Sequence, residues 1–475
     1  MLSEDPPLEL IQSIINLHND RKFQLALSST QKLVEQFPKS AITFNLAGAI
    51  NAELSQFDQA IKYYKKAVDI RPSYYEAFYN MGVAQQSKNY FKEAIESYSK
   101  ALVIKPNYAD PFNNIGFIQH SQGNFKDAIE SYSKAIEIKP DFAAAFNNIA
   151  NSLIEIGDFE SAADNLSEAI RIKPDYADAN SNIIKLLTFY TPKKEISNSF
   201  IQINNEIRKI KINNNISEAI SNNTAINLFE TTKKLINKNL KKLTYQETQI
   251  YRNNTTSLNC RRHMSVFKEN DIIPKFCFSC FKVQVEPNSV IDLIKLFVVF
   301  DQLDLDENNT RKCYVELRPN ISGFYKGLIY CNSIEQANNI AKYVDLIIKN
   351  RIGSDLLVTV KRGCSEYPLS FPEYQETNKN GSHVMKYNHD WKAIEQNYEE
   401  KNPHDLNESR RLSLRGLNIS DVIIIQKWVD YAKGIQDPSA YLLNRDEVHH
   451  PEIYKKAKER VDIFYRESHL AKGKK

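Results

Sequence analysis

A proline recurs every 34 residues in the first part of this 475-residue chain, at Pro38, Pro72, Pro106, Pro140 and Pro174. Proline ends α-helices because it has no amide hydrogen to donate and because it disfavours helical backbone in the residue before it. The segments between these prolines have a helix-turn-helix pattern. A fixed period of this length predicts a solenoid, in which each repeat packs on its neighbours.

Small residues recur in phase with the prolines. If position 1 is placed at Ala41, repeats begin at Ala41, Tyr75, Ala109, Ala143 and Ala177, and a more degenerate repeat covers roughly residues 8–40. We expect the two helices of a repeat to cross at the small residues, because only a tiny side chain lets two backbones approach closely. Position 8 is Gly48, Gly82, Gly116 and Ala150, position 20 is Ala26, Ala60, Ala94, Ala128 and Ala162, and position 27 is Ala67, Ala101, Ala135 and Ala169.

With this period and these small residues, the chain resembles the tetratricopeptide-repeat family over residues 1–190. The resemblance implies a solenoid of about five helix pairs, with a degenerate first unit and a partial last unit. In that family the pairs stack into a right-handed superhelix, and the first helix of each pair lines a concave groove that binds other proteins. The resemblance therefore implies a scaffold or adaptor in protein interactions.

Asparagine occupies position 6 of the first helix in four repeats, at Asn80, Asn114, Asn148 and Asn182. Each carboxamide offers one acceptor and two donors, which suits pairing with the amides of an extended peptide. The blocks FYNMG, FNNIG and FNNIA are similar to repeats of the O-linked N-acetylglucosamine transferase superhelix, where a ladder of asparagines holds peptide backbone. The neighbouring Tyr79, Asn113 and Asn147 are further peptide-contact candidates. The alternative is that these asparagines solvate the face or bond one repeat to the next.

Positive charge is concentrated after the repeats. Residues 1–190 hold 18 Lys and Arg against 23 Asp and Glu, whereas residues 191–262 hold 13 against five. The segment 191–262 has apolar residues at helical spacing, so we expect a basic helical connector. A lysine cluster there could attract nucleic acid, or it could be a solvated face. Its members are Lys233, Lys234, Lys238, Lys241 and Lys242.

The pattern changes to strands and helices over residues 263–365. Segments 276–287, 311–319, 323–332 and 355–364 read as strands, and residues 288–305 and 333–350 read as helices, with Asn288 or Ser289 and Ser333 at their starts. The order βαββαβ predicts an α+β domain of the ferredoxin-like type. The strand Lys326 to Cys331 resembles the signature of the RNA-recognition module, but Leu328 stands where a stacking aromatic is expected.

All six cysteines lie between Cys260 and Cys364. Cys260 and His263, followed by Cys277 and Cys280, have spacing close to that of a zinc finger, and these donors suit Zn²⁺. The alternative is a set of buried structural thiols, because free cysteine is among the most buried residue types. No cofactor other than zinc is indicated.

Three functions remain open from the sequence. The first is a protein-interaction scaffold that binds extended peptide segments in the groove. The second is an enzyme in which the repeats select a protein substrate and the cysteine-containing domain acts on it, with zinc, although no catalytic motif is found. The third is an RNA-associated adaptor that uses residues 191–262.

The rest of the chain supplies context but no chemistry. Residues 366–475 read as a mixed tail with helices near 420–433, where Trp428 lies on the apolar face, and near 452–467. The sparse cysteines and the acidic start MLSEDPPLEL favour a reducing, cytoplasmic location without export. No apolar run approaches the ~20 residues of a membrane span.

Overall fold

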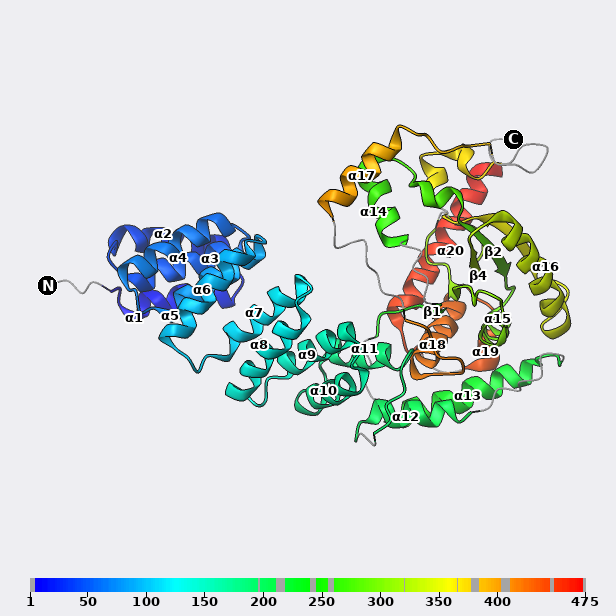
Figure 1. Cartoon of the computed structure of the whole chain (residues 1–475), viewed down its shortest axis with the longest axis horizontal. Coiled ribbons are helices and arrows are strands. Elements are labelled where there is room, and N and C mark those ends of the chain that lie inside the picture. Colours follow the sequence, from blue (N-terminus) through cyan, green and yellow to red (C-terminus); the bar gives the residue numbers. More distant parts are fainter. Residues whose placement is uncertain are drawn as a thin grey trace. The chain divides into compact units, whose positions relative to one another are not determined.

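The computed structural model divides the chain into two compact units, residues 1–182 and residues 183–475, which we call the repeat unit and the C-terminal unit (Figure 1). The structure describes residues 5–194, 197–210, 218–239, 245–254, 260–319, 321–364, 366–376, 384–402, 411–444 and 448–472. None of the helices within these ranges is both long and apolar enough to cross a membrane.

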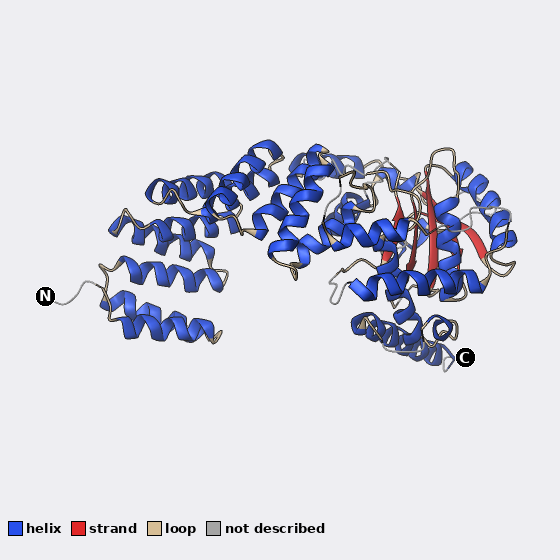
Figure 2. Ribbon diagram, turned by 90° about the horizontal axis from the view of Figure 1, so that it is seen from below, coloured by secondary structure: helices blue, strands red, loops and turns tan. Residues whose placement is uncertain are grey.

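The repeat unit consists of helices packed as consecutive pairs, which are seen stacked in Figure 2. The pairs are α1 (Leu8–Asn19) with α2 (Phe23–Gln36), α3 (Ala41–Glu53) with α4 (Phe57–Ile70), α5 (Tyr75–Ser87) with α6 (Phe91–Ile104), α7 (Ala109–Ser121) with α8 (Phe125–Ile138), and α9 (Ala143–Ile156) with α10 (Phe159–Ile172). Helix α11 (Ala177–Leu186) follows them as the first helix of a partial repeat. The predicted α solenoid is therefore present.

The second helix of each pair ends shortly before its proline. Helix α4 ends at Ile70 before Pro72, and α6 ends at Ile104 before Pro106. The same spacing recurs at α2, α8 and α10. This is the expected effect of proline on the residue that precedes it.

The small residues at positions 20 and 27 are fully buried between helices, as expected. The glycines at position 8 have a more specific role than close backbone approach. A Cβ atom on Gly48 would lie 2.5 Å from the ring of Tyr64, and one on Gly116 would lie 2.8 Å from the ring of Tyr132. Each glycine thus makes room for the tyrosine at position 24 of its own repeat. In the repeat with Ala150, position 24 is Leu166.

A five-stranded antiparallel sheet forms the centre of the C-terminal unit, in the order β1-β3-β4-β2-β5 (Figure 2). The strands are β1 (Gln249–Arg252), β2 (Phe281–Glu286), β3 (Arg311–Val315), β4 (Tyr325–Cys331) and β5 (Leu357–Arg362). Helix α15 (Val290–Gln302) connects β2 to β3, and α16 (Ile334–Arg351) connects β4 to β5. Ser289 and Ser333 cap these helices through their side-chain oxygens, as predicted.

Helix α15 covers one face of this sheet. Gly327 of β4 lies opposite Val285 of β2, and a side chain at Gly327 would overlap Leu296 and Phe300 of α15. Since successive residues of a strand point to opposite faces, the alternate residues, such as Lys282 and Tyr330, lie on the other face. We call this second side the open face of the sheet.

Segments other than the predicted βαββαβ elements complete the C-terminal unit. They form α12 (Ser199–Arg208), α13 (Asn222–Asn239), α14 (Cys260–Asn270), α17 (Trp391–Lys401), α18 (Ile419–Gly434), α19 (Ala440–Leu443) and α20 (Pro451–Lys472). Residues 191–262 are not only helical as expected, because residues 249–252 form β1 and pair with β3. The helices predicted near 420–433 and 452–467 are present as α18 and α20, and every residue of α18 is buried, including those outside its apolar face.

A buried ion network ties α18 to the sheet. The guanidinium group of Arg252 in β1 donates to Asp301 of α15 at 2.5 Å and to Asp421 of α18 at 2.8 Å. It also donates to the carbonyl oxygen of Gly416 at 3.1 Å. All three charged side chains are at least nine-tenths buried. The guanidinium group of Arg252 therefore links β1, α15 and α18, which are far apart in the sequence.

Candidate functional site

The asparagines at position 6 form a regular ladder of hydrogen bonds along the first helices of successive repeats. In every case the carboxamide nitrogen donates to the side chain at position 5 of the preceding repeat. The bonds run from Asn80 to Asn45 at 3.1 Å, from Asn114 to the hydroxyl of Tyr79 at 3.4 Å, from Asn148 to Asn113 at 3.1 Å, and from Asn182 to Asn147 at 2.9 Å. The ladder therefore links each repeat to the one before it.

Two members of the ladder keep most of their hydrogen-bonding capacity. Among the described residues, the side chains of Asn80 and Asn148 each make one hydrogen bond, so each retains its carboxamide oxygen and one N–H. Asn114 also donates to the hydroxyl of Tyr98 at 3.2 Å, and Asn182 donates to Asn151 at 3.0 Å. Asn80 and Asn148 are partly exposed. They are thus fixed by one bond and still able to bind a ligand.

Apolar side chains lie beside the ladder. Val83 and Phe117, at position 9 of two successive repeats, are 38% and 47% exposed. Each follows its ladder asparagine by three residues, so the two side chains share one face of the helix. We call the residues at positions 5, 6 and 9 the ladder face. It combines open amide groups with an apolar surface.

The margin of the ladder face is acidic. Position 2 of the first helices carries Glu76, Asp110 and Asp178, and Lys185, at position 9 of the partial last repeat, is the one Lys or Arg at positions 2, 5, 6 and 9. The pKa of the Tyr79 hydroxyl is raised, mainly by burial and also by the nearby Asp110 carboxylate. In the four repeats before it, the ladder face has no cation that could clamp a carboxylate group.

The predicted zinc ligands are placed on several different elements. Cys260 and His263 lie in the first turn of α14, and the ring of His263 stacks on Phe276 with 5.2 Å between ring centres. Cys277 lies in a short 3₁₀ helix, Lys275–Phe278, and its sulfur is 3.2 Å from the hydroxyl of Tyr367. Cys280 precedes β2 and packs against Gly363.

These four residues do not form a ligand set in the described part of the chain. No group of three or more His, Cys, Asp or Glu side chains within it is arranged to hold a metal ion. The expected strand through Cys277 was also incorrect, because β2 starts only at Phe281. The ring of His263 stacks on Phe276, and the thiol of Cys277 forms a hydrogen bond with the hydroxyl of Tyr367. The residues as placed do not fit a zinc centre, so we assign no chemistry to one.

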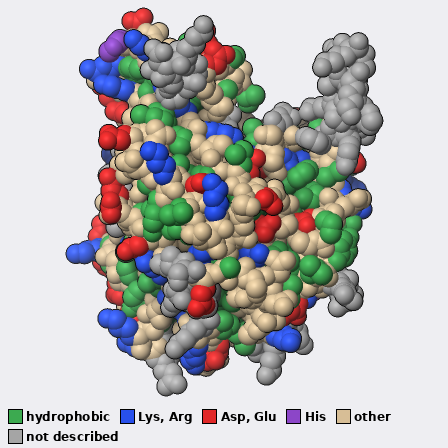
Figure 3. Space-filling view, turned by 90° about the vertical axis from the view of Figure 1, so that its right-hand side faces the viewer, with side chains coloured by type: hydrophobic (Ala, Val, Ile, Leu, Met, Phe, Trp, Pro, Cys, Tyr) green, Lys and Arg blue, Asp and Glu red, His purple; other side chains and the backbone are tan. Residues whose placement is uncertain are grey.

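The predicted lysine cluster is described only in part. Lys233 and Lys234 lie on α13, and the ammonium group of Lys233 lies 5.8 Å from the ring centre of Phe229 on the same helix. Lys241 and Lys242 lie outside the described residues, as does the side chain of Lys238. On the face of the molecule seen in Figure 3, basic and acidic side chains are interspersed among those drawn in colour.

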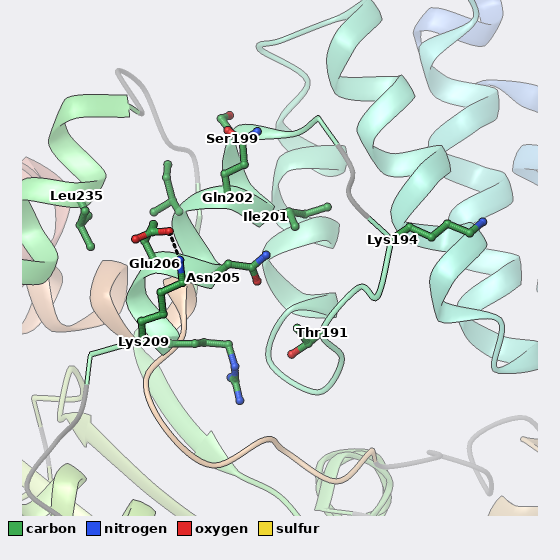
Figure 4. A pocket seen from close by; sticks show the side chains of 11 residues that line it. Thr191, Lys194, Ser199, Ile201, Gln202, Asn205, Glu206, Lys209 and Leu235 are labelled. Carbon is green, nitrogen blue, oxygen red and sulfur yellow. Dashed lines mark hydrogen bonds and ion pairs between the residues drawn. The ribbon is translucent and has the colours of Figure 1, made fainter.

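A hollow with a volume of about 840 Å³ lies beside α12. Figure 4 shows side chains that line it, of which Gln202, Asn205 and Glu206 come from α12 and Lys209 follows that helix. Glu206 and Lys209 form an ion pair at 2.6 Å. The charges of Glu206 and Lys209 thus balance each other, while Lys194 and Arg208 also line the hollow, and we assign it no ligand.

Lys282 and Lys312 are functional candidates that were not predicted from the sequence. Both lie on the open face of the sheet, beside a second hollow. Strand alternation was the available signal, because a lysine that alternates with buried valines must point to the opposite face. The free energy needed to bury the two ammonium groups depends on how deeply each lysine lies in the fold, and the sequence alone does not show that depth.

Comparison with protein-family models identifies the repeats as tetratricopeptide repeats. Family models described as TPR repeat match residues 48–89 and 87–123, and models described as tetratricopeptide repeat match residues 109–142 and 143–176. These matches confirm the repeats predicted from the sequence. A search of curated proteins found no match.

Several solved structures are similar to part of the chain. MamA is 25% identical, and the alignment covers 34% of this chain and 95% of MamA, with a TM-score of 0.32. YrrB, described as a TPR protein with an unusual peptide-binding site, is 22% identical over 36% of this chain and 88% of its own, with a TM-score of 0.31. PilF of Pseudomonas aeruginosa is 17% identical, and the alignment covers 38% of this chain and 81% of PilF, with a TM-score of 0.35.

Proposed function

Because residues 48–176 are tetratricopeptide repeats, we propose that the repeat unit binds an extended peptide segment of another protein along the ladder face. The observation that carries this proposal is the open edge of the ladder. Asn80 and Asn148 are each held by one hydrogen bond and retain one acceptor and one donor. The backbone of an extended peptide presents the complementary N–H and C=O groups at regular intervals.

The apolar residues of the ladder face would supply much of the affinity. Phe117 is 47% exposed, so a partner can bury about half of a side chain whose full burial contributes ~1.5–3 kcal/mol. Amide pairs contribute less, because they replace hydrogen bonds to water. We therefore expect the asparagines to set the register of the peptide and Phe117 and Val83 to anchor it.

The acidic margin indicates the charge of the partner segment. Glu76, Asp110 and Asp178 lie beside the ladder face, on which Lys185 in the partial last repeat is the one Lys or Arg. Electrostatic complementarity favours a segment with Lys or Arg and disfavours an acidic one. The partner class is thus an extended, basic peptide segment that contains apolar residues.

We further propose that the C-terminal unit contains a ferredoxin-like arrangement. Its elements run β2-α15-β3-β4-α16-β5, and these four strands lie in the order β3-β4-β2-β5 with antiparallel neighbours. Strand β1 is then an addition at the edge beside β3. This arrangement hosts many functions, so it implies none by itself.

The test is a selection of random peptides on phage against the full chain, followed by affinity measurement with one selected peptide. We expect basic peptides to be enriched, and Phe117→Ser to weaken binding of the selected peptide about three- to tenfold, from the exposed half of the ring that the peptide buries. The control is Val103→Ser, because Val103 is 82% exposed but lies on α6, a second helix. Equal affinity of the wild type and Phe117→Ser would refute the proposal.

A further inference from the structure

The open face of the sheet carries a second hollow, which the proposed peptide site does not involve. It has a volume of about 460 Å³ and is lined by residues of β1 to β4, the start of α14 and the segment after β5. Ligand-binding pockets typically measure about 300–1,000 Å³. The hollow is therefore large enough for a small organic molecule.

Lys282 of β2 lines this hollow without a partner. Its side chain is 5% exposed, and its ammonium group makes no hydrogen bond or ion pair with any described residue. Burial lowers the pKa of Lys282 to about 8. A buried ammonium group without a partner is costly. Lys361 of β5 lies next to Lys282 on the same face, but its ammonium group pairs with the carboxylate of Glu286 at 3.5 Å.

Lys312 of β3 points into the same hollow. Its ammonium group donates to the Gln249 carboxamide at 3.0 Å and lies 4.7 Å from the ring centre of Tyr314 and 5.9 Å from that of Tyr330. Its pKa is lowered to about 8, first by burial and then by repulsion from Lys282. The two lysines therefore lie close enough to disfavour each other's charge.

The carboxylates that line the hollow are engaged by other cations. Glu316 pairs with Arg318 at 2.8 Å and with Lys326 at 3.2 Å. Glu366 also pairs with Arg318. Neither forms an ion pair with Lys282 or Lys312 among the described residues. Glu366 acts on both lysines through space, and Cys364 acts on Lys282, but no ion pair joins these described residues to the lysines. An anion from outside the chain could therefore pair directly with both ammonium groups.

We propose that this hollow binds a small ligand that carries a phosphate or carboxylate group joined to a planar ring. The anionic group lies between the ammonium groups of Lys282 and Lys312. The ring packs against the tyrosines of the hollow, of which Tyr330 lies directly across from Lys282 and Tyr251 is 37% exposed at its edge. A nucleoside monophosphate has both parts and suits the volume.

Isothermal titration calorimetry of the full chain with AMP tests the proposal, with adenosine and inorganic phosphate as separate titrants. We expect AMP to bind more tightly than either fragment. Lys282→Met should weaken AMP binding at least tenfold, because it removes a charged partner of the anionic group. Lys282→Met should still fold, since it replaces a buried unpartnered charge by an apolar chain of similar length.

The matched control is Lys361→Met, which removes a lysine of the same sheet face that already has a partner. It should change AMP affinity less than twofold. The proposal is overturned if AMP does not bind, or if the two variants lose affinity equally. Binding of inorganic phosphate as tightly as AMP would remove the planar ring from the proposal. Binding of a single-stranded oligonucleotide without binding of AMP would overturn the assignment of a small-molecule site.

Discussion

A Cβ atom on Gly82 would lie 2.6 Å from a ring carbon of Tyr98. Real Cβ atoms do not approach other atoms this closely, so the glycine at position 8 and the tyrosine at position 24 depend on each other. Where position 24 is Leu166, position 8 is Ala150. The spacing between the two helices of a repeat is thus set by a matched pair of side chains.

The variant Gly82→Ala tests this pairing. Overpacking of a tight core costs about 1–3 kcal/mol, and the higher helix propensity of alanine offsets ~1 kcal/mol of it. We expect a net loss of about 1 kcal/mol in the free energy of unfolding, measured by urea denaturation and circular dichroism. The double variant Gly82→Ala/Tyr98→Leu should lose less stability than the sum of the losses in the two single variants, by ~1 kcal/mol or more.

The reciprocal experiment serves as the control. Leu166→Tyr should destabilise the chain while Ala150 is present, and adding Ala150→Gly should restore stability. If Gly82→Ala were neutral or stabilising with Tyr98 in place, the account of the glycine positions would be wrong.

Arg252 is predicted to be the most sensitive charged residue of the C-terminal unit. Arg252→Ala leaves the carboxylates of Asp301 and Asp421 buried without their cation, and breaking such a buried pair costs about 3–5 kcal/mol. Both tryptophans, Trp391 and Trp428, lie in this unit, so their fluorescence reports its unfolding. Arg415→Ala is the comparison, because the Arg415 pair with Asp304 is exposed and should contribute at most ~1 kcal/mol.

His263 should make the C-terminal unit less stable in acid. Burial, with a smaller effect of Arg262, lowers the pKa of His263 to about 4, below the ordinary value of ~6.5. The unfolded state therefore binds the proton first as the pH falls, and stability is lost between pH ~6.5 and ~4. At ~1.4 kcal/mol per pH unit, the loss should reach about 2 kcal/mol at pH 5.

Tryptophan fluorescence during urea denaturation at pH 7.5 and at pH 5 measures this loss. The variant His263→Phe keeps a ring against Phe276 and should lack that part of the pH dependence. An identical difference between the two pH values in the wild type and the variant would exclude His263 as the cause.

The repeats could be predicted from the sequence because their determinants are local. Proline ends helices through its own backbone, and Ser289 and Ser333 cap helices through side chains three residues away from their bonding partners. The ladder asparagines were also visible by their period. Their partners at position 5 of the preceding repeat depend on how neighbouring helix pairs stack, which periodicity alone does not specify.

The C-terminal unit was less predictable because its determinants are distant in sequence. Helix α18 has buried polar residues whose partners, such as Arg252 for Asp421, lie 169 positions away. Strand β1 is four residues long and is defined by its pairing with β3. The Cys277 segment has strand-like composition, yet it forms a 3₁₀ turn before β2.

We propose that the asparagine ladder contacts peptide and does not merely join the repeats. Asn148→Ala tests it when stability and the affinity of a selected peptide are measured on the same variant. Loss of the bond to Asn113 should cost ~1 kcal/mol of stability in either case. Asn165→Ala is the control, because the Asn165 amide donates to Ser161 within its own helix, α10. We predict that Asn148→Ala weakens peptide binding about fivefold or more, as expected for ~1 kcal/mol of lost hydrogen bonding, while Asn165→Ala leaves it unchanged. Reduced stability with unchanged peptide affinity in Asn148→Ala would contradict the claim.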